Sequence, residues 1–149
     1  MESITNYFEA KIRYIKAEAK TDVKIDTESK KKKVTESYLI NAVNYTDAET
    51  TLIKELPYEE LTILSIKKSN IVELITNNDN TEGKYYKIKI AILEYDDKGK
   101  EKETPLYCMV IANSAKQAIT YLNNFNKNTI ADSKIKTVTE TDIVELLNN

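Results

Sequence analysis

The chain is 149 residues long, with 41% hydrophobic and 31% charged residues, which is enough for one folded domain or two very small ones. It has no histidine, one cysteine and two glycines, which excludes histidine-dependent catalysis, zinc sites of histidine or of cysteine alone, an internal disulfide and glycine-rich phosphate loops. We therefore expect no enzyme, no cofactor and no metal site, and the net charge of -2 means that nucleic acid would have to be attracted by a local patch.

No stretch of the sequence approaches the roughly 18 consecutive apolar residues that a membrane-spanning helix needs. The first residues also lack the basic and then apolar segments of a signal peptide. We expect a cytoplasmic protein without a membrane partner.

The first half of the chain reads as two strands followed by a helix. Apolar and polar residues alternate with a period of two over 8–14, which predicts a half-buried strand, and the apolar run over 36–44 predicts a second strand. We expect a helix next, with Thr46 as its N-cap and Glu49 completing a capping box. The helix should stop before Pro57.

The second half repeats this order. Strands are predicted over 86–92 and 106–112, joined by a hairpin because the segment 96–100 carries Asp-Lys-Gly between two alternating runs. A helix is expected to start at Ser114.

A third strand closes each half, over 62–68 and over 134–139. Two short apolar segments follow these strands, over 70–75 and 142–147. Their periodicity is compatible with either a short strand or a single helical turn.

Three blocks recur in the same order along the chain. The matching segments are 7–12 with 85–90 at an offset of 78, 38–42 with 108–112 at an offset of 70, and 71–74 with 143–146 at an offset of 72. The chain therefore reads as a tandem duplication, with copies at about 1–76 and 84–149 and a linker at 77–83. The fall in offset from 78 to 70 predicts a longer hairpin tip in the first copy, within about 17–33.

One copy has too small a core to be stable alone, and two copies that share a core remove this problem. We expect a single α+β domain over 1–149 with pseudo-twofold symmetry, two helices, and either one continuous antiparallel-rich sheet or two small sheets packed together. The outer strand edges would allow a homodimer.

Four segments resemble an uncharacterised bacterial and phage family, domain-of-unknown-function family 4494: residues 7–14, 33–42, 45–49 and 138–143. The resemblance covers nearly the whole chain and departs from the family at Tyr7, where we expect Trp, and at Asn41, where we expect Asp. It implies an origin in Bacteroidetes, their mobile elements or their phages, including the crAss-like group. It implies no activity and no site.

The outward faces of the two matching first strands are the main candidate site. If Phe8 and Tyr86 point inward, the opposite faces carry Tyr7, Lys11, Arg13, Tyr85, Lys87 and Lys89. Aromatic rings interleaved with cations on a sheet are typical of single-stranded nucleic-acid binding, and a pseudo-twofold domain would present both faces as one platform. The pattern predicts a non-enzymatic protein that binds single-stranded DNA or RNA. The alternative is an ordinary solvated strand face.

Two other functions remain open. The protein would serve as a virion component or as an adaptor that engages a host or phage protein through a sheet edge, or it would bind a small nucleotide in a cleft between the copies. The bacterial host cell is the expected location, with a place in the virion left open. Cys108 lies in an apolar run, and we expect a small buried hydrophobe there rather than a nucleophile.

Overall fold

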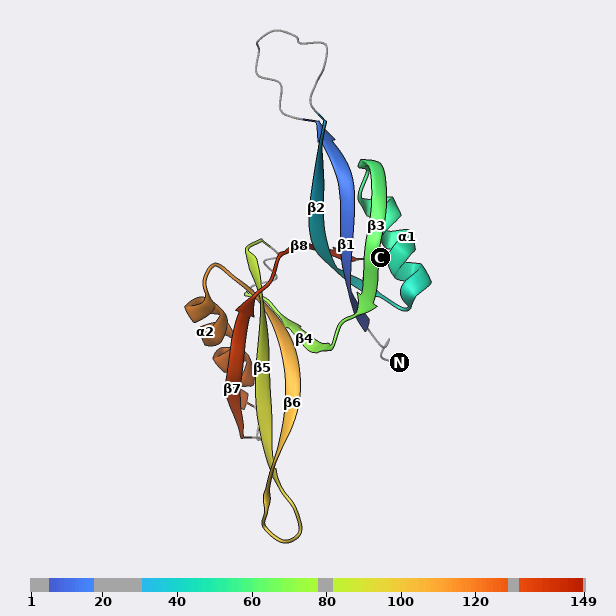
Figure 1. Ribbon diagram of the computed structural model, residues 1–149. Helices are drawn as coiled ribbons and strands as arrows, with labels where there is room; N and C mark the ends of the chain where they lie inside the picture. Colours follow the sequence, from blue (N-terminus) through green and yellow to red (C-terminus); the bar gives the residue numbers. More distant parts are fainter. Residues whose placement is uncertain (1–5, 18–30, 78–81, 129–131, 149) are drawn as a thin grey trace. The chain divides into compact units, whose positions relative to one another are not determined.

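The computed structural model describes residues 6–17, 31–77, 82–128 and 132–148. The fold class is α+β, as predicted, with two mostly antiparallel four-stranded sheets and one α-helix beside each sheet (Figure 1). The chain divides into two compact units, one made of Met1–Ser69 with Val144–Asn149 and the other of Asn70–Ile143.

The first unit contains a sheet with the strand order β3-β1-β2-β8. Its elements are β1 (Asn6–Ala17), β2 (Lys31–Ala42), α1 (Tyr45–Glu55), β3 (Glu59–Lys68) and β8 (Ile143–Asn148). Phe8 and Ile12 of β1 are buried with Leu52 of α1, so the helix covers the face of the sheet to which these residues point. The period of two seen in the sequence is therefore the alternation between this core and the opposite face.

The second unit has the strand order β4-β6-β5-β7. Its elements are β4 (Ile71–Ile75), β5 (Lys84–Tyr95), β6 (Glu101–Ala112), α2 (Ala115–Phe125), a 3-10 turn (Asn126–Asn128) and β7 (Ser133–Glu140). Tyr86 and Ile88 of β5 are buried with Leu122 of α2, so this helix also covers one face of its sheet.

The two short apolar segments are strands, and each one joins the sheet of the other copy. β4 follows β3 in sequence but pairs in parallel with β6 of the second unit. β8, at the end of the second copy, lies beside β2 in the first sheet. Each sheet is therefore completed by the last strand of the other repeat.

The hairpins account for the change of offset between the repeats. β1 and β2 pair up to Ala17 and Lys31, and β5 and β6 pair up to Tyr95 and Glu101. The intervening segments have thirteen and five residues, and the difference of eight equals the fall in offset from 78 to 70. The tip of the first hairpin, residues 18–30, lies outside the described residues.

The second hairpin is closed by Asp96. Its carboxylate accepts hydrogen bonds from the backbone N–H groups of Lys98 and Lys100, at 2.9 and 2.8 Å. Gly99 adopts a φ of +77°, a backbone conformation that residues with a side chain rarely adopt. Asp96 and Gly99 therefore close the hairpin that was predicted over 96–100.

A β-bulge recurs in both copies. The pairing of β1 with β3 skips Leu64, and the pairing of β5 with β7 skips Lys136, which lies 72 positions later. A bulge adds one residue to a strand and bends it locally. Its presence at equivalent positions supports the duplication.

The predicted cap of the first helix is wrong by two residues. Asn44, rather than Thr46, is the N-cap, and its side chain accepts a hydrogen bond from the Asp47 N–H at 2.8 Å. The Asp47 carboxylate in turn accepts from the Val43 N–H at 2.9 Å, which replaces the expected role of Glu49. Asn44 thus satisfies one N–H group of the first helical turn, and Asp47 bonds the residue before the cap rather than the cap itself.

The second helix begins as predicted. Ser114 is its N-cap and accepts from the Gln117 N–H at 3.1 Å. Within the described residues, no helix is long and apolar enough to cross a membrane.

Candidate nucleic-acid interface

The six residues predicted from the sequence lie on the sheet faces that point away from the helices. Phe8 and Tyr86 are 2% and 4% exposed in the two helix-covered cores, so strand alternation directs their neighbours to the opposite face. We call this opposite face the helix-free face of each sheet. On β1, Lys11 and Arg13 are exposed there and Tyr7 is half-buried.

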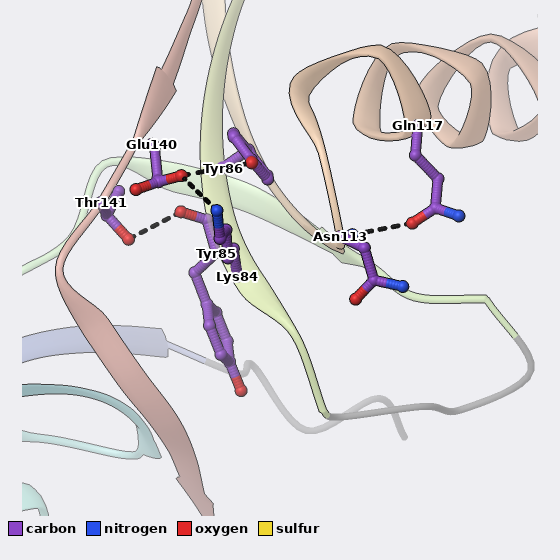
Figure 2. Close-up of polar contacts among 7 residues, drawn as sticks. All are labelled: Lys84, Tyr85, Tyr86, Asn113, Gln117, Glu140 and Thr141. Atoms are coloured by element: carbon purple, nitrogen blue, oxygen red, sulfur yellow. Dashed lines mark hydrogen bonds and ion pairs between the residues drawn. The ribbon is translucent and has the colours of Figure 1, made fainter.

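Tyr85 lies on the helix-free face of its sheet but is fully buried, at 0% exposure. Figure 2 shows its side chain and that of Tyr86 leaving β5 in opposite directions. The Tyr85 carbonyl accepts hydrogen bonds from the Thr141 N–H and hydroxyl, both at 2.8 Å. Because the Tyr85 ring is fully buried, a base cannot stack on it, whereas the sequence led us to expect an outward tyrosine.

The surroundings of Tyr85 are held by polar contacts (Figure 2). Glu140 accepts a hydrogen bond from the Tyr86 hydroxyl at 3.3 Å and forms an ion pair with Lys84 at 3.3 Å. The Tyr7 carbonyl of the first copy accepts from the Ser69 N–H at 2.8 Å, as the Tyr85 carbonyl does from Thr141. These equivalent positions anchor the end of the third strand in each copy.

A tyrosine that was not predicted from the sequence lies next to the two predicted lysines of β5. Tyr107 of β6 lies directly opposite Lys89 in the register. The Lys87 Nζ lies 5.5 Å and the Lys89 Nζ 6.0 Å from the centroid of the Tyr107 ring. All three side chains are half-buried. The sequence placed Lys87 and Lys89 on this face, where the structure also has them, and did not single out Tyr107 as their neighbouring ring.

Two further lysines extend this basic surface along β7. Lys134 and Lys136 form ion pairs with Glu103 of β6, at 3.4 and 3.2 Å. The hydrogen bond from Lys136, together with the charges of both lysines, lowers the pKa of the Glu103 carboxyl. Glu103 is therefore an ionised acceptor at neutral pH.

A shallow cavity of about 370 Å³ opens between these groups. Its lining consists of Lys89, Ala91, Glu103, Pro105, Lys136 and Thr137. Ala91 and Pro105 face each other across β5 and β6 and supply the apolar part. The cavity exists because Ala91 is the smallest residue of its row, flanked by Lys89 and Leu93 on the same face.

The first sheet does not reproduce this arrangement. Arg13 stands where the second copy has Ala91, and Ser37 stands where it has Tyr107. In the described part of this face, around Lys11 and Arg13, the positions of the ring and of the small residue are thus taken by a serine and an arginine. The second sheet is therefore the better candidate site.

A cluster of tyrosines around Glu36 is specific to the first unit. The hydroxyl of Tyr14 donates a hydrogen bond to the Glu36 carboxylate, and the Tyr14 ring stacks on Tyr58 with centroids 3.8 Å apart. The Tyr38 hydroxyl lies 3.4 Å from both the Glu36 carboxylate and the Tyr58 hydroxyl. The hydrogen bond to Glu36, followed by burial, raises the pKa of Tyr14. The second copy has Ile92, Leu106 and Cys108 at the positions of Tyr14, Glu36 and Tyr38, so this polar cluster stabilises one unit only.

Cys108 is buried at 5% exposure, as the apolar run predicted. Burial, with a smaller contribution from the charge of Glu73, raises the pKa of its thiol. A protonated, buried thiol is a poor nucleophile. Within the described residues, no group of three or more acidic or cysteine side chains is arranged to hold a metal ion.

Tyr107, Glu103 and the two lysines of β7 were missed by sequence reasoning. The signal for Tyr107 was present, because Leu106, Cys108 and Val110 alternate inward and so turn Tyr107 outward. The hairpin of five residues then fixes Tyr107 opposite Lys89. Lys136 had no such signal, because its orientation depends on the bulge.

The comparisons with known proteins agree with the resemblance seen in the sequence. The model of the family described as "Domain of unknown function (DUF4494)" matches residues 6–149. No curated protein and no solved structure matches the chain. The match spans both copies of the repeat, and the chain belongs to the DUF4494 family.

Proposed function

We propose that this protein binds single-stranded nucleic acid through the helix-free face of its second sheet. The binding surface, which we call the basic face, consists of Lys87, Lys89, Tyr107, Lys134 and Lys136. The observation that supports this most directly is the pair of ammonium groups gathered around the Tyr107 ring. β-Sheets that bind single-stranded nucleic acid use aromatic rings to stack on the bases and cations to contact the phosphates.

The contacts around Tyr107 are weak enough to be exchanged for a ligand. Cation-π contacts at accessible sites contribute about 0.5–1 kcal/mol. Stacking of a base on an aromatic side chain contributes about 1–3 kcal/mol. Stacking of one base on Tyr107 is therefore of the same size as, or larger than, the cation-π contacts that it would replace.

The net charge of -2 does not oppose this function. Screening at 0.1 M salt reduces interactions beyond about 10 Å, so the nearby groups dominate the field at the basic face. Glu103 forms ion pairs with both Lys134 and Lys136, so these three side chains together keep a net positive charge.

Fluorescence anisotropy with a labelled oligothymidylate of about 15 nucleotides tests the proposal at low and at physiological salt. Tyr107→Ser introduces the residue of the first copy and should weaken binding by about 5- to 150-fold. Lys89→Gln should weaken binding and flatten the dependence of log K on log salt by about 0.7. Lys116→Gln is the matched control, because it removes the same charge at an exposed position of α2.

Two outcomes would refute the proposal. One is the absence of binding at low salt. The other is equal affinity for the Lys89→Gln and Lys116→Gln proteins, because binding would then depend on overall charge alone. A protein partner that co-purifies at high salt after nuclease treatment, in a protein that does not bind the oligonucleotide, would favour the adaptor function instead.

A further inference from the structure

The cavity beside Tyr107 combines apolar lining residues with charged ones. Its apolar part consists of Ala91, which is 3% exposed, and of the exposed Pro105, against which a flat ring would pack. Its rim carries the Glu103 carboxylate and the Lys89 and Lys136 ammonium groups. Tyr107 follows Pro105 on the same face of β6, so a strand stacked on Tyr107 would place an adjacent base over the cavity.

Glu103 determines which base fits best. The Lys136 Nζ lies 3.3 Å from Oε1 and 3.2 Å from Oε2, and the Lys134 Nζ lies 3.4 Å from Oε1. An ionised carboxylate has about four lone-pair positions, so it retains acceptor capacity beside these lysines. The ion pairs also keep Glu103 charged and therefore unable to donate.

Guanine matches this arrangement better than the other bases. Its N1–H and N2 amino groups are adjacent donors that a carboxylate accepts in a bidentate manner. Its O6 and N7 are acceptors for lysine. Adenine and cytosine have acceptors beside their single amino group, and thymine and uracil place carbonyl oxygens on both sides of their one N–H, so each would bring an acceptor near the Glu103 oxygens.

We infer that the cavity formed by Ala91, Pro105, Glu103, Lys89 and Lys136 binds a guanine base. Glu103 accepts hydrogen bonds from N1–H and N2–H, and a lysine donates to O6. This inference rests on the proposed function for guanine within a strand. A free guanine nucleotide offers the same chemistry, and the experiment distinguishes the two sources.

The test compares labelled oligothymidylates that carry one central guanine, adenine or cytosine, with unlabelled guanosine monophosphate as competitor. We expect the guanine-containing strand to bind at least about tenfold more tightly than the adenine-containing strand. Glu103→Gln should abolish this preference, while affinity for plain oligothymidylate stays equal or rises because a negative charge is removed. Lys116→Gln should keep the preference.

Ala91→Arg provides a second variant, since it fills the cavity with the residue that the first copy has at Arg13. It should remove the guanine preference and keep binding to oligothymidylate. Glu103→Gln alters only an exposed side chain, so the test does not depend on how well the arginine variant folds.

The outcomes separate the inference from the proposed function. Equal affinity for the guanine and adenine strands overturns the inference and leaves the proposed function intact. Binding of guanosine monophosphate without binding of any oligonucleotide supports the guanine site and overturns the proposed function. A guanine preference that persists in Glu103→Gln overturns the assignment of the site to this cavity.

Discussion

β8 comes from the second copy but completes the sheet of the first unit. A substitution in β8 should therefore destabilise the first unit. Leu147 of β8 is 6% exposed and belongs to the core of the first unit, together with Phe8 and Leu52. Leu147→Ala removes three carbon atoms. At about 0.8 kcal/mol for each buried carbon group, the transfer loss is roughly 2.5 kcal/mol.

A cavity left by the leucine would add to this loss. β8 lies at the edge of its sheet, so its neighbours can move inward and limit the cavity. We therefore expect the free energy of unfolding to fall by about 2–3 kcal/mol, near the lower end of the range for leucine to alanine. For a chain of this length, the midpoint of thermal unfolding should fall by roughly 5–10 °C.

Urea denaturation measures the loss, and native-state hydrogen exchange locates it. In Leu147→Ala, the amides of β1 and β2 should lose protection before those of β5 and β6. Val144→Ala, on the same strand but 46% exposed, is the matched control and should cost less than about 1 kcal/mol. Ile75→Ala on β4, 4% exposed in the core of the second unit, should show the opposite pattern of exchange.

The reasoning would be refuted if Leu147→Ala were no more destabilising than Val144→Ala. It would also be refuted if Leu147→Ala opened β5 and β6 first, because the last strand would then support its own copy. Equal loss of protection in both units would contradict the assignment of β8 to the first core.

Two further predictions concern the first unit. Asn44→Ala should cost about 1 kcal/mol in urea denaturation because it removes the helix cap, whereas Thr46→Ala should cost less than about 0.5 kcal/mol; the reverse order would contradict the observed cap. The pKa of Tyr14 is raised above its ordinary value of 10 by its hydrogen bond to Glu36, so its contribution to stability is complete below pH 10 and is lost as the pH rises further. At pH 8 the Tyr14→Phe protein should therefore be less stable than the unchanged protein, but between pH 9 and 11 it should lose less stability than the unchanged protein does. Urea midpoints that fall in parallel for the two proteins over that range would contradict this mechanism.

The local structure was predictable wherever a short segment determines it. The alternation around Phe8 fixed the inward face of β1, and the hairpin at Asp96 fixed the register of β5 with β6. The cap at Asn44 was misassigned because Asn44 and Thr46 are both good caps and the sequence around each offers an acidic residue three positions later. Only the position of the first helical turn decides between them.

The destination of the short strands could not be predicted from the sequence. The apolar residues of β4 and β8 show that each segment must be buried, but either sheet would bury them. The choice depends on the direction that the chain takes after Ser69 and Thr141, where each is bonded to the carbonyl of an equivalent tyrosine. The burial of Tyr85 escaped prediction for a similar reason, since alternation gives the face of a residue and not its accessibility.

The divergence of the two copies shows where function is to be sought. The parts that hold the fold together recur in both: the hairpin, the helix over one face, the bulge and the exchanged last strand. The helix-free faces differ, because Ser37 corresponds to Tyr107 and Arg13 to Ala91. Since each sheet needs a strand from the other copy, both copies are required for the fold even if only one carries a site. Among the described residues, the Tyr107 ring and the small Ala91 occur together in the second copy, where the first has Ser37 and Arg13, and this divergence is the reason for proposing the binding face on the second sheet.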